Sequence, residues 1–268
     1  MPDPTIFTQL INSYFPKPHA SLFNGMVFGV SLKTSKIFYN QLKMVGLLHL
    51  VVLSGMNITI IASFIAIATQ WLGKFVSTVL TILIIILFII FVRPQAPIIR
   101  AGFMGILTFV SILYGRKPIA LYILILSAVF IGIFWPQWIT SISFQLSFGA
   151  TLGIILFYKK TIAESKTFVG QLKAALWDEF KTSLSAQIFT APLIFLYFKQ
   201  ISVISPVANV LVSFTVAPLM IFGFLTIFLG SIAWGLGYIT SIICLGILHY
   251  IVVTVDILSK VPYGYFSF

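Results

Sequence analysis

The stretch Gly46–Ile60 (GLLHLVVLSGMNITI) places polar and small side chains inside an apolar run that is long enough to cross a lipid bilayer. His49, Ser54, Gly55 and Asn57 lie near its middle. Polar groups at membrane depth are costly, so they usually face a bundle interior or a water-filled path and mark function. In one continuous helix, the polar positions from 46 to 57 fall within an arc of about 140°. The sequence therefore predicts one helix with a polar face directed toward such an interior.

Arg100 is the charged residue of a second apolar segment, 97–114, where it shares a helical face with further polar residues. Two roles for it stay open. It is either a fixed cation that meets the phosphates of a passing strand in turn, or a structural arginine bonded to backbone carbonyls freed near Pro94 and Pro97.

Three later apolar segments carry polar residues at helical spacing, and their candidates for the interior are Gln145, Gln187 and Asn209. Gly149 and Gly153 have the small-residue spacing that lets membrane helices approach closely, so we expect them to serve helix packing. A single polar stripe is usually a hydrogen-bonding contact between helices. Five stripes, one of them with an arginine, favour a hydrated interior.

Composition assigns the chain to the helical membrane proteins. Of its 268 residues 60% are hydrophobic and 8% are charged, and its mean hydropathy is +1.12. A soluble domain carries about a quarter charged residues. The expected fold is all-α: a polytopic bundle of about seven to nine membrane segments, some of them broken, with short interfacial helices before residue 44. Spans are expected near 44–70, 75–92, 97–114, 118–134, 142–158, 182–198, 201–229 and 236–258, in a single domain over residues 1–268.

The charge of the chain is strongly basic, with 16 Lys and Arg against 5 Asp and Glu, or +11. This excess fits contact with lipid headgroups and membrane topology, and it also fits a path for a polyanion. His19, His49 and His249 are scattered, and Cys244 is the single cysteine. Because the ligand clusters of a zinc or two-metal site are missing, we expect no catalytic centre, no metal ion and no cofactor.

The segment around His49 resembles the HLLAISGLH-type signature of the competence domain of the ComEC/Rec2 family, with Asn57 in place of the usual second histidine. RPQAPIIRAGFMG, ISFQLSFGATLGIILF and SLSAQIFTAPLIFLYFKQISVISPVANVLV are similar to three further family segments, in the same order. The chain is identified as a member of the family on this resemblance. The residues then expected along a DNA path are His49, Ser54, Gly55, Asn57, Arg100, Gln145, Ser147, Gln187 and Asn209.

The resemblance implies a multi-pass channel in the cytoplasmic membrane that takes up single-stranded DNA during natural transformation. It implies membrane lipids and single-stranded DNA as partners, together with separate nuclease, DNA-binding and cytoplasmic ATPase or helicase components, and it leaves an oligomer open. The chain has no room for the family's oligonucleotide-binding-type domain, and nothing in it resembles the metallo-β-lactamase-like domain. A nuclease role is therefore not expected.

Two other functions stay open from the residues alone. A permease for small solutes or anions fits the broken helices and Arg100, although the internal repeat expected of many permeases is not found. An intramembrane serine hydrolase would need a buried nucleophile and a histidine base, for which Ser54 and His249 are the ingredients. Loss of DNA uptake on removal of the chain would favour the channel over both.

Overall fold

The structure is a computed structural model that describes residues 5–51, 54–92, 94–159 and 167–267. Within these residues it consists almost wholly of α-helices, which confirms the expected all-α class. The helices are α1 (Thr5–Tyr14), α2 (His19–Phe28), α3 (Lys36–Val45), α4 (Leu48–Val51), α5 (Gly55–Thr69), α6 (Lys74–Val92), α7 (Ala96–Leu113), α8 (Ala120–Phe134), α9 (Ile142–Phe157), α10 (Phe168–Phe198), α11 (Ser205–Ile232) and α12 (Trp234–Ser259). Two short strands, β1 (Gln200–Ser202) and β2 (Tyr265–Ser267), pair antiparallel.

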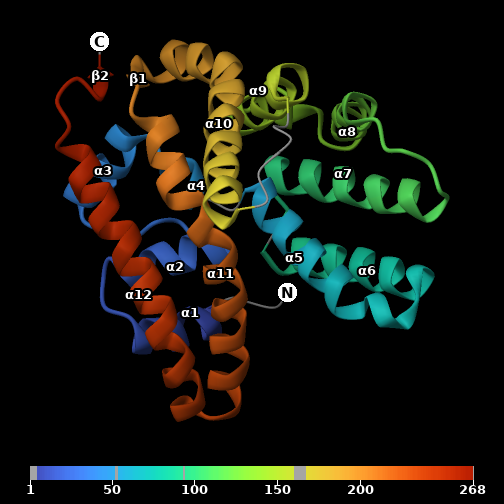
Figure 1. The fold of residues 1–268 in the computed structure, drawn as a ribbon, viewed down its shortest axis with the longest axis horizontal. Helices are drawn as coiled ribbons and strands as arrows, with labels where there is room; N and C mark the ends of the chain where they lie inside the picture. The colour runs from blue at the N-terminus through green and yellow to red at the C-terminus, as the bar shows by residue number, and fades with distance from the viewer. Residues whose placement is uncertain (1–4, 52–53, 93, 160–166, 268) are drawn as a thin grey trace.

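The helices form two arms joined by α10 (Figure 1). The first arm is the hairpin of α11 and α12, with the N-terminal helices α1 to α4 packed beside it. The second arm contains α5 to α9, in which α5, α6 and α7 pack on one another and α8 and α9 pack on α7. α10 contacts α9 on one side and α11 on the other, so it connects the arms.

Five described helices are long and apolar enough to cross a membrane: α5 with the turn that follows it, α6, α7, α11 and α12. α8 and α9 are apolar but shorter, with 15 and 16 residues. The predicted span 182–198 is the second half of α10, which begins earlier, at Phe168, and contains Pro192. These elements are those of a polytopic helical membrane protein, and the number of crossings stays a prediction.

The expected single span 44–70 is wrong, because the chain turns at Gly46. This glycine ends α3 with a φ of +77°, a left-handed conformation that side chains disfavour. A Cβ there would lie 2.7 Å from Ser205 Cβ, and Ser202 Oγ donates a hydrogen bond to the Met44 carbonyl at 2.8 Å. Two short pieces, α3 and α4, therefore precede α5, and the polar arc predicted for one continuous helix does not form.

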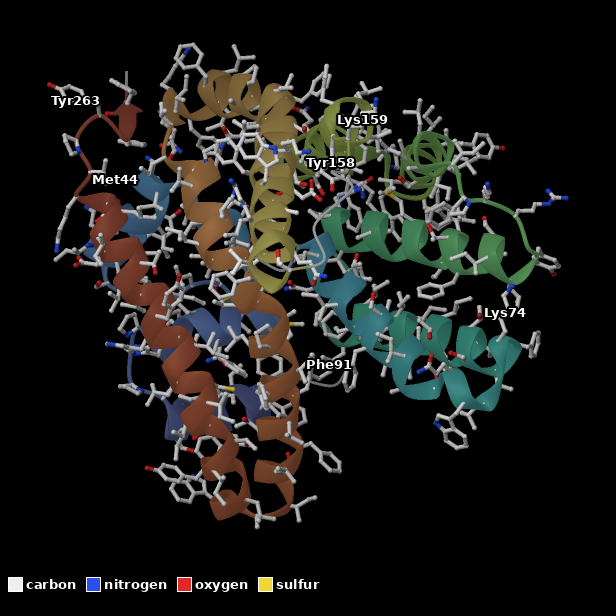
Figure 2. All side chains as sticks on the ribbon, viewed as in Figure 1. Met44, Lys74, Phe91, Tyr158, Lys159 and Tyr263 are labelled. Atoms are coloured by element: carbon white, nitrogen blue, oxygen red, sulfur yellow. The ribbon has the colours of Figure 1, made fainter. Side chains whose placement is uncertain are left out.

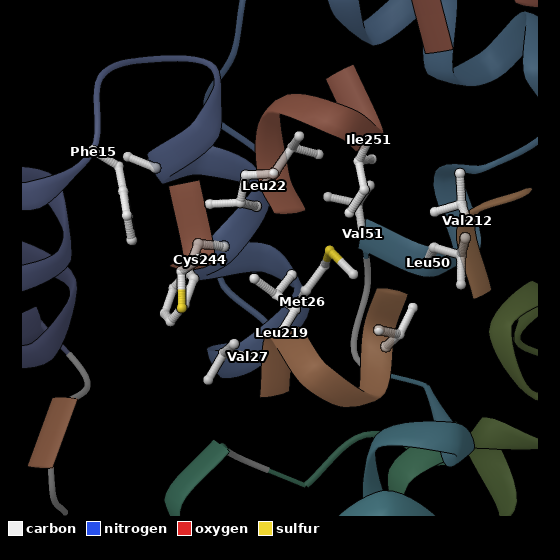
Figure 3. Packing of buried hydrophobic residues seen from close by; sticks show 14 of the residues in the cluster. Phe15, Leu22, Met26, Val27, Leu50, Val51, Val212, Leu219, Cys244 and Ile251 are labelled. Carbon is white, nitrogen blue, oxygen red and sulfur yellow. The ribbon is translucent and has the colours of Figure 1, made fainter. Parts of the chain in front are cut away.

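α2 also differs from the expected interfacial helix, because eight of its ten residues are buried. Figure 3 shows its side chains Leu22, Met26 and Val27 in one cluster with side chains of α4, α11 and α12. Its hydrophobic residues surround the whole helix rather than one stripe, which is typical of a helix inside a core. α2 therefore fills the centre of the first arm.

Phe91 of α6 connects the arms through aromatic contacts (Figure 2). Its ring centroid lies 5.9 Å from that of Phe7 and 6.1 Å from that of Phe28, both in edge-to-face arrangement. Beside it, an apolar groove of about 390 Å³ runs between α5, α6 and α11, with Phe64, Phe88 and further aliphatic residues in its walls. None of the candidate polar residues lines this groove.

Candidate functional site

Arg100 is positioned by α7, whose first turn contains Pro97, a residue favoured at helix starts because its φ is already helical. The Arg100 side chain is only 6% exposed. Its Nε and Nη2 both donate to Ser147 Oγ of α9, at 3.1 and 2.8 Å, and its Nη1 donates to Met104 Sδ at 3.2 Å. The guanidinium therefore joins α7 to α9 inside the second arm.

The positive charge of Arg100 has no carboxylate partner among the described residues. The ion pairs of that part of the chain join Lys181 to Asp178 and Lys260 to Asp256. The acceptors of Arg100 are one hydroxyl and one thioether, fewer than its N–H groups, and neither is a backbone carbonyl. The structure thus differs from the alternative of an arginine held by carbonyls near the prolines. It leaves a buried charge that no carboxylate of the described residues neutralises, which is costly in the absence of an anion.

The start of α5 lies against Arg100. A Cβ added at Gly55 would be 3.0 Å from Ala101 Cβ and 3.6 Å from Arg100 Nη2, so a larger residue would crowd the guanidinium. Ser54 is the N-cap residue of α5, but its hydroxyl caps no backbone N–H. The N–H groups of Gly55 and Met56 have no acceptor within the described chain. The positive end of the helix dipole therefore lies beside a second positive group.

Asn57 has a different place, in contact with the first arm. It is 2% exposed, and its Nδ2 donates to the Met26 carbonyl at 2.7 Å. Met26 belongs to the last turn of α2, where carbonyls lack an intrahelical partner. Asn57 therefore caps α2 from α5, and its hydrogen bond joins the two arms rather than Asn57 and Arg100.

Replacement of Asn57 by leucine is expected to lower the free energy of unfolding by about 1–3 kcal/mol, because the Met26 carbonyl would stay buried without a donor. The measurement is the thermal unfolding of the purified protein in detergent. Ser111→Ala is the matched control, since the Ser111 hydroxyl donates only to the Leu107 carbonyl of its own helix. A stable Asn57→Leu protein with impaired transport would instead indicate a role in the path.

Gln145 and Asn209 both contact α10. Tyr197 Oη donates to Gln145 Oε1 at 2.7 Å, and Asn209 Nδ2 donates to Ser183 Oγ at 2.7 Å. Asn209 Oδ1 is buried with no donor among the described residues. The half-buried Gln187 side chain makes no hydrogen bond to them. These contacts are separate pairs, so the predicted residues do not form one hydrogen-bonded network.

No hydrogen bond among the described residues joins a histidine to Arg100. His49 of α4 is exposed, and its Nδ1 lies 3.0 Å from the Gly46 carbonyl oxygen. His249 of α12 lies against His19 of α2, with the ring centroids 5.8 Å apart. No hydrogen bond between described residues joins His249 to Ser54, the two residues named for the serine hydrolase alternative.

Gly149 and Gly153 lie where α9 crosses α10. A Cβ added at Gly149 would be 3.3 Å from Phe189 Cβ, and one at Gly153 would overlap the carbonyl oxygen of Ser185. The two helices therefore approach at backbone distance. Because Ser147 lies on the same helix, this packing also helps to set where its hydroxyl meets Arg100.

Sequence reasoning missed two parts of the site. It treated 44–70 as one helix, so the open amides at the start of α5 were not foreseen, although Gly46 and the Ser54-Gly55 pair are both signals for a break. It also missed Tyr197 as the partner of Gln145, for which no signal exists in the local sequence.

The fold and this site define a polytopic helical membrane protein that holds an arginine without a counter-ion among its described residues. The sequence matches the family model described as Competence protein over residues 26–268, and the chain belongs to this family. The resemblance to the ComEC/Rec2 competence domain is thereby confirmed, and membership suggests a role in competence.

A protein of Aquifex aeolicus (strain VF5), described only as uncharacterized, is 32% identical over 213 residues. The alignment covers 78% of this chain and 47% of that protein. The chain thus spans about half the length of this relative. No solved structure matches the chain.

Proposed function

We propose that this chain forms a channel through which single-stranded DNA crosses the cytoplasmic membrane during natural transformation. Membership of the Competence family supports a role in DNA uptake. The structural observation that carries the proposal is the buried guanidinium of Arg100, which lacks a carboxylate partner among the described residues.

The physical problem of such a channel is the charge of its cargo. A single strand carries a negative charge on each phosphate, and the low dielectric of a membrane strongly disfavours these charges. A fixed cation within the bundle would offset this penalty for successive phosphates. The chain has 16 basic and 5 acidic residues, and this net positive charge would raise the local concentration of nucleic acid near the membrane.

We assign no chemical step to this chain. In this proposal a separate nuclease supplies the single strand, a DNA-binding component delivers it, and a cytoplasmic ATPase or helicase draws it inward. The chain itself contributes the path within the lipid, alone or as an oligomer. The assignment of the nuclease step to a separate protein is supported by the sequence, in which the three histidines are far apart and form no metal-binding motif.

An anion permease is the second candidate, because a single buried cation would serve a small anion as well as a phosphodiester. The two functions differ in the size of the cargo. A permease would move inorganic phosphate or a similar anion and would leave DNA outside the cell.

Deletion of the chain tests the proposal. We expect labelled DNA to remain bound at the cell surface, while the label that is protected from added nuclease falls to background and returns when the full chain is supplied again. Uptake of labelled inorganic phosphate is measured in the same cells. Undiminished DNA entry in the deletion strain would reject the channel, and a selective loss of phosphate uptake would favour the permease.

A further inference from the structure

We propose that Arg100, Ser147 and the first amides of α5 form a single binding station for an oxyanion of the phosphate class. That the anion is a backbone phosphate of DNA rests on the proposed function. The station itself rests only on the geometry around the guanidinium.

The first argument is that the unused hydrogen-bonding groups beside Arg100 are donors. Ser147 Oγ accepts from both Nε and Nη2 of Arg100, and its own O–H makes no hydrogen bond to a described residue. The N–H groups of Gly55 and Met56 are likewise open within the described chain, and the guanidinium has more N–H groups than acceptors. The unused groups of Arg100, Ser147, Gly55 and Met56 are thus all donors, which is the complement of an oxyanion.

The second argument is the charge. A helix N-terminus attracts anions through its free amides and its dipole. Here a guanidinium that is 6% exposed lies beside it, and no carboxylate among the described residues neutralises either group. Two like partial charges held side by side repel each other, and an anion between them removes this repulsion.

The Ser147 hydroxyl would allow a bound anion to dissociate, because it takes over hydrogen bonds of the guanidinium. The hydroxyl is a neutral acceptor that holds Nε and Nη2 when no anion is bound, so the guanidinium is never left without hydrogen bonds. A carboxylate in its place would compete permanently with the anion. Binding at this station should therefore be weak and quickly reversible, as passage of successive phosphates requires.

A cysteine placed at Ser54 would report the local potential. Ser54 is half-buried and directly precedes Gly55, whereas the native Cys244 is fully buried and serves as the background in the unmodified protein. The full-length Ser54→Cys protein in membranes is treated with a negatively charged and a positively charged methanethiosulfonate reagent. We expect the anionic reagent to react faster than the cationic one. The ratio of the anionic to the cationic rate should fall about tenfold or more when Arg100→Gln is added.

Two comparisons make this test specific. Arg116 is exposed and directly follows the turn at the end of α7, so Arg116→Gln should leave the ratio unchanged. Sodium phosphate should slow the anionic reagent more than sodium chloride of equal ionic strength. Thr59→Cys, one turn along α5 and exposed, provides a second reporter if Ser54→Cys fails to fold.

The outcomes separate the station from the channel. A rate ratio that does not depend on Arg100, or a lack of reaction at both cysteines, overturns the station even if deletion of the chain abolishes DNA entry. A ratio that depends on Arg100 and on phosphate supports the station, and it does so even if DNA entry is independent of the chain, in which case the proposed channel fails alone.

Discussion

Replacement of Arg100 by glutamine is expected to reduce DNA entry by about tenfold or more, with the protein still folded and inserted, because the cation that attracts phosphate is lost. Glutamine keeps a hydrogen-bonding side chain near Ser147. Arg100→Lys should retain much of the transport, since an ammonium still attracts phosphate as a point charge. The measurement is nuclease-protected labelled DNA divided by the amount of protein in the membrane.

A purely structural arginine would give another pattern. Arg100 bonds Ser147 through two nitrogens of its fork, and lysine cannot reproduce this geometry. In that case both substitutions should lower the abundance of the protein in the membrane. Arg116→Gln is the control for the loss of one positive charge. Undiminished DNA entry with Arg100→Gln at normal abundance would remove Arg100 from the mechanism.

Replacement of Gly153 by alanine is expected to have the largest effect on stability. The added methyl group would overlap the carbonyl oxygen of Ser185, a backbone atom that moves only if α10 moves. Overpacking of this kind costs about 1–3 kcal/mol, and more where backbone must shift. We expect a lower thermal unfolding midpoint of the purified protein and a smaller amount of it in the membrane.

Gly246 of α12 provides the matched control, because no heavy atom lies within 4 Å of the Cβ that alanine would add there. Gly246→Ala should leave stability unchanged or slightly raised, since alanine favours the helix over glycine. A Gly153→Ala protein as stable as the Gly246→Ala protein would mean that α9 and α10 do not cross at backbone distance.

Several parts of the fold could be predicted because they depend on local sequence. Segments 75–92 and 97–114 correspond closely to α6 and α7, since each is a long apolar run between polar or proline residues. Gly149 and Gly153 were expected at a helix contact, where the structure has them against α10. In both cases the signal lies within a few turns of one helix.

The predictions that failed needed information from distant residues. α2 is a core helix, packed with α4, α11 and α12. Its hydrophobic residues on all sides are a local signal for this, but which helices surround it is decided by the tertiary structure. Gly46 in the sequence is compatible with a position inside a long span. In the structure it lies in a turn that packs against Ser205, a residue about 160 positions later, and this contact is not visible in the local sequence.

The sequence by itself determined the all-α membrane class and the family, because hydropathy and the order of motifs are properties of the linear chain. It also indicated Arg100 as a candidate, since a charged side chain in an apolar membrane segment is costly and usually has a function. Only the tertiary structure decided what surrounds that arginine. Ser147 of α9 bonds to the guanidinium, and Gly55 of α5 lies beside it. The packing of these two helices against α7 determines which donors near Arg100 have no acceptor among the described residues.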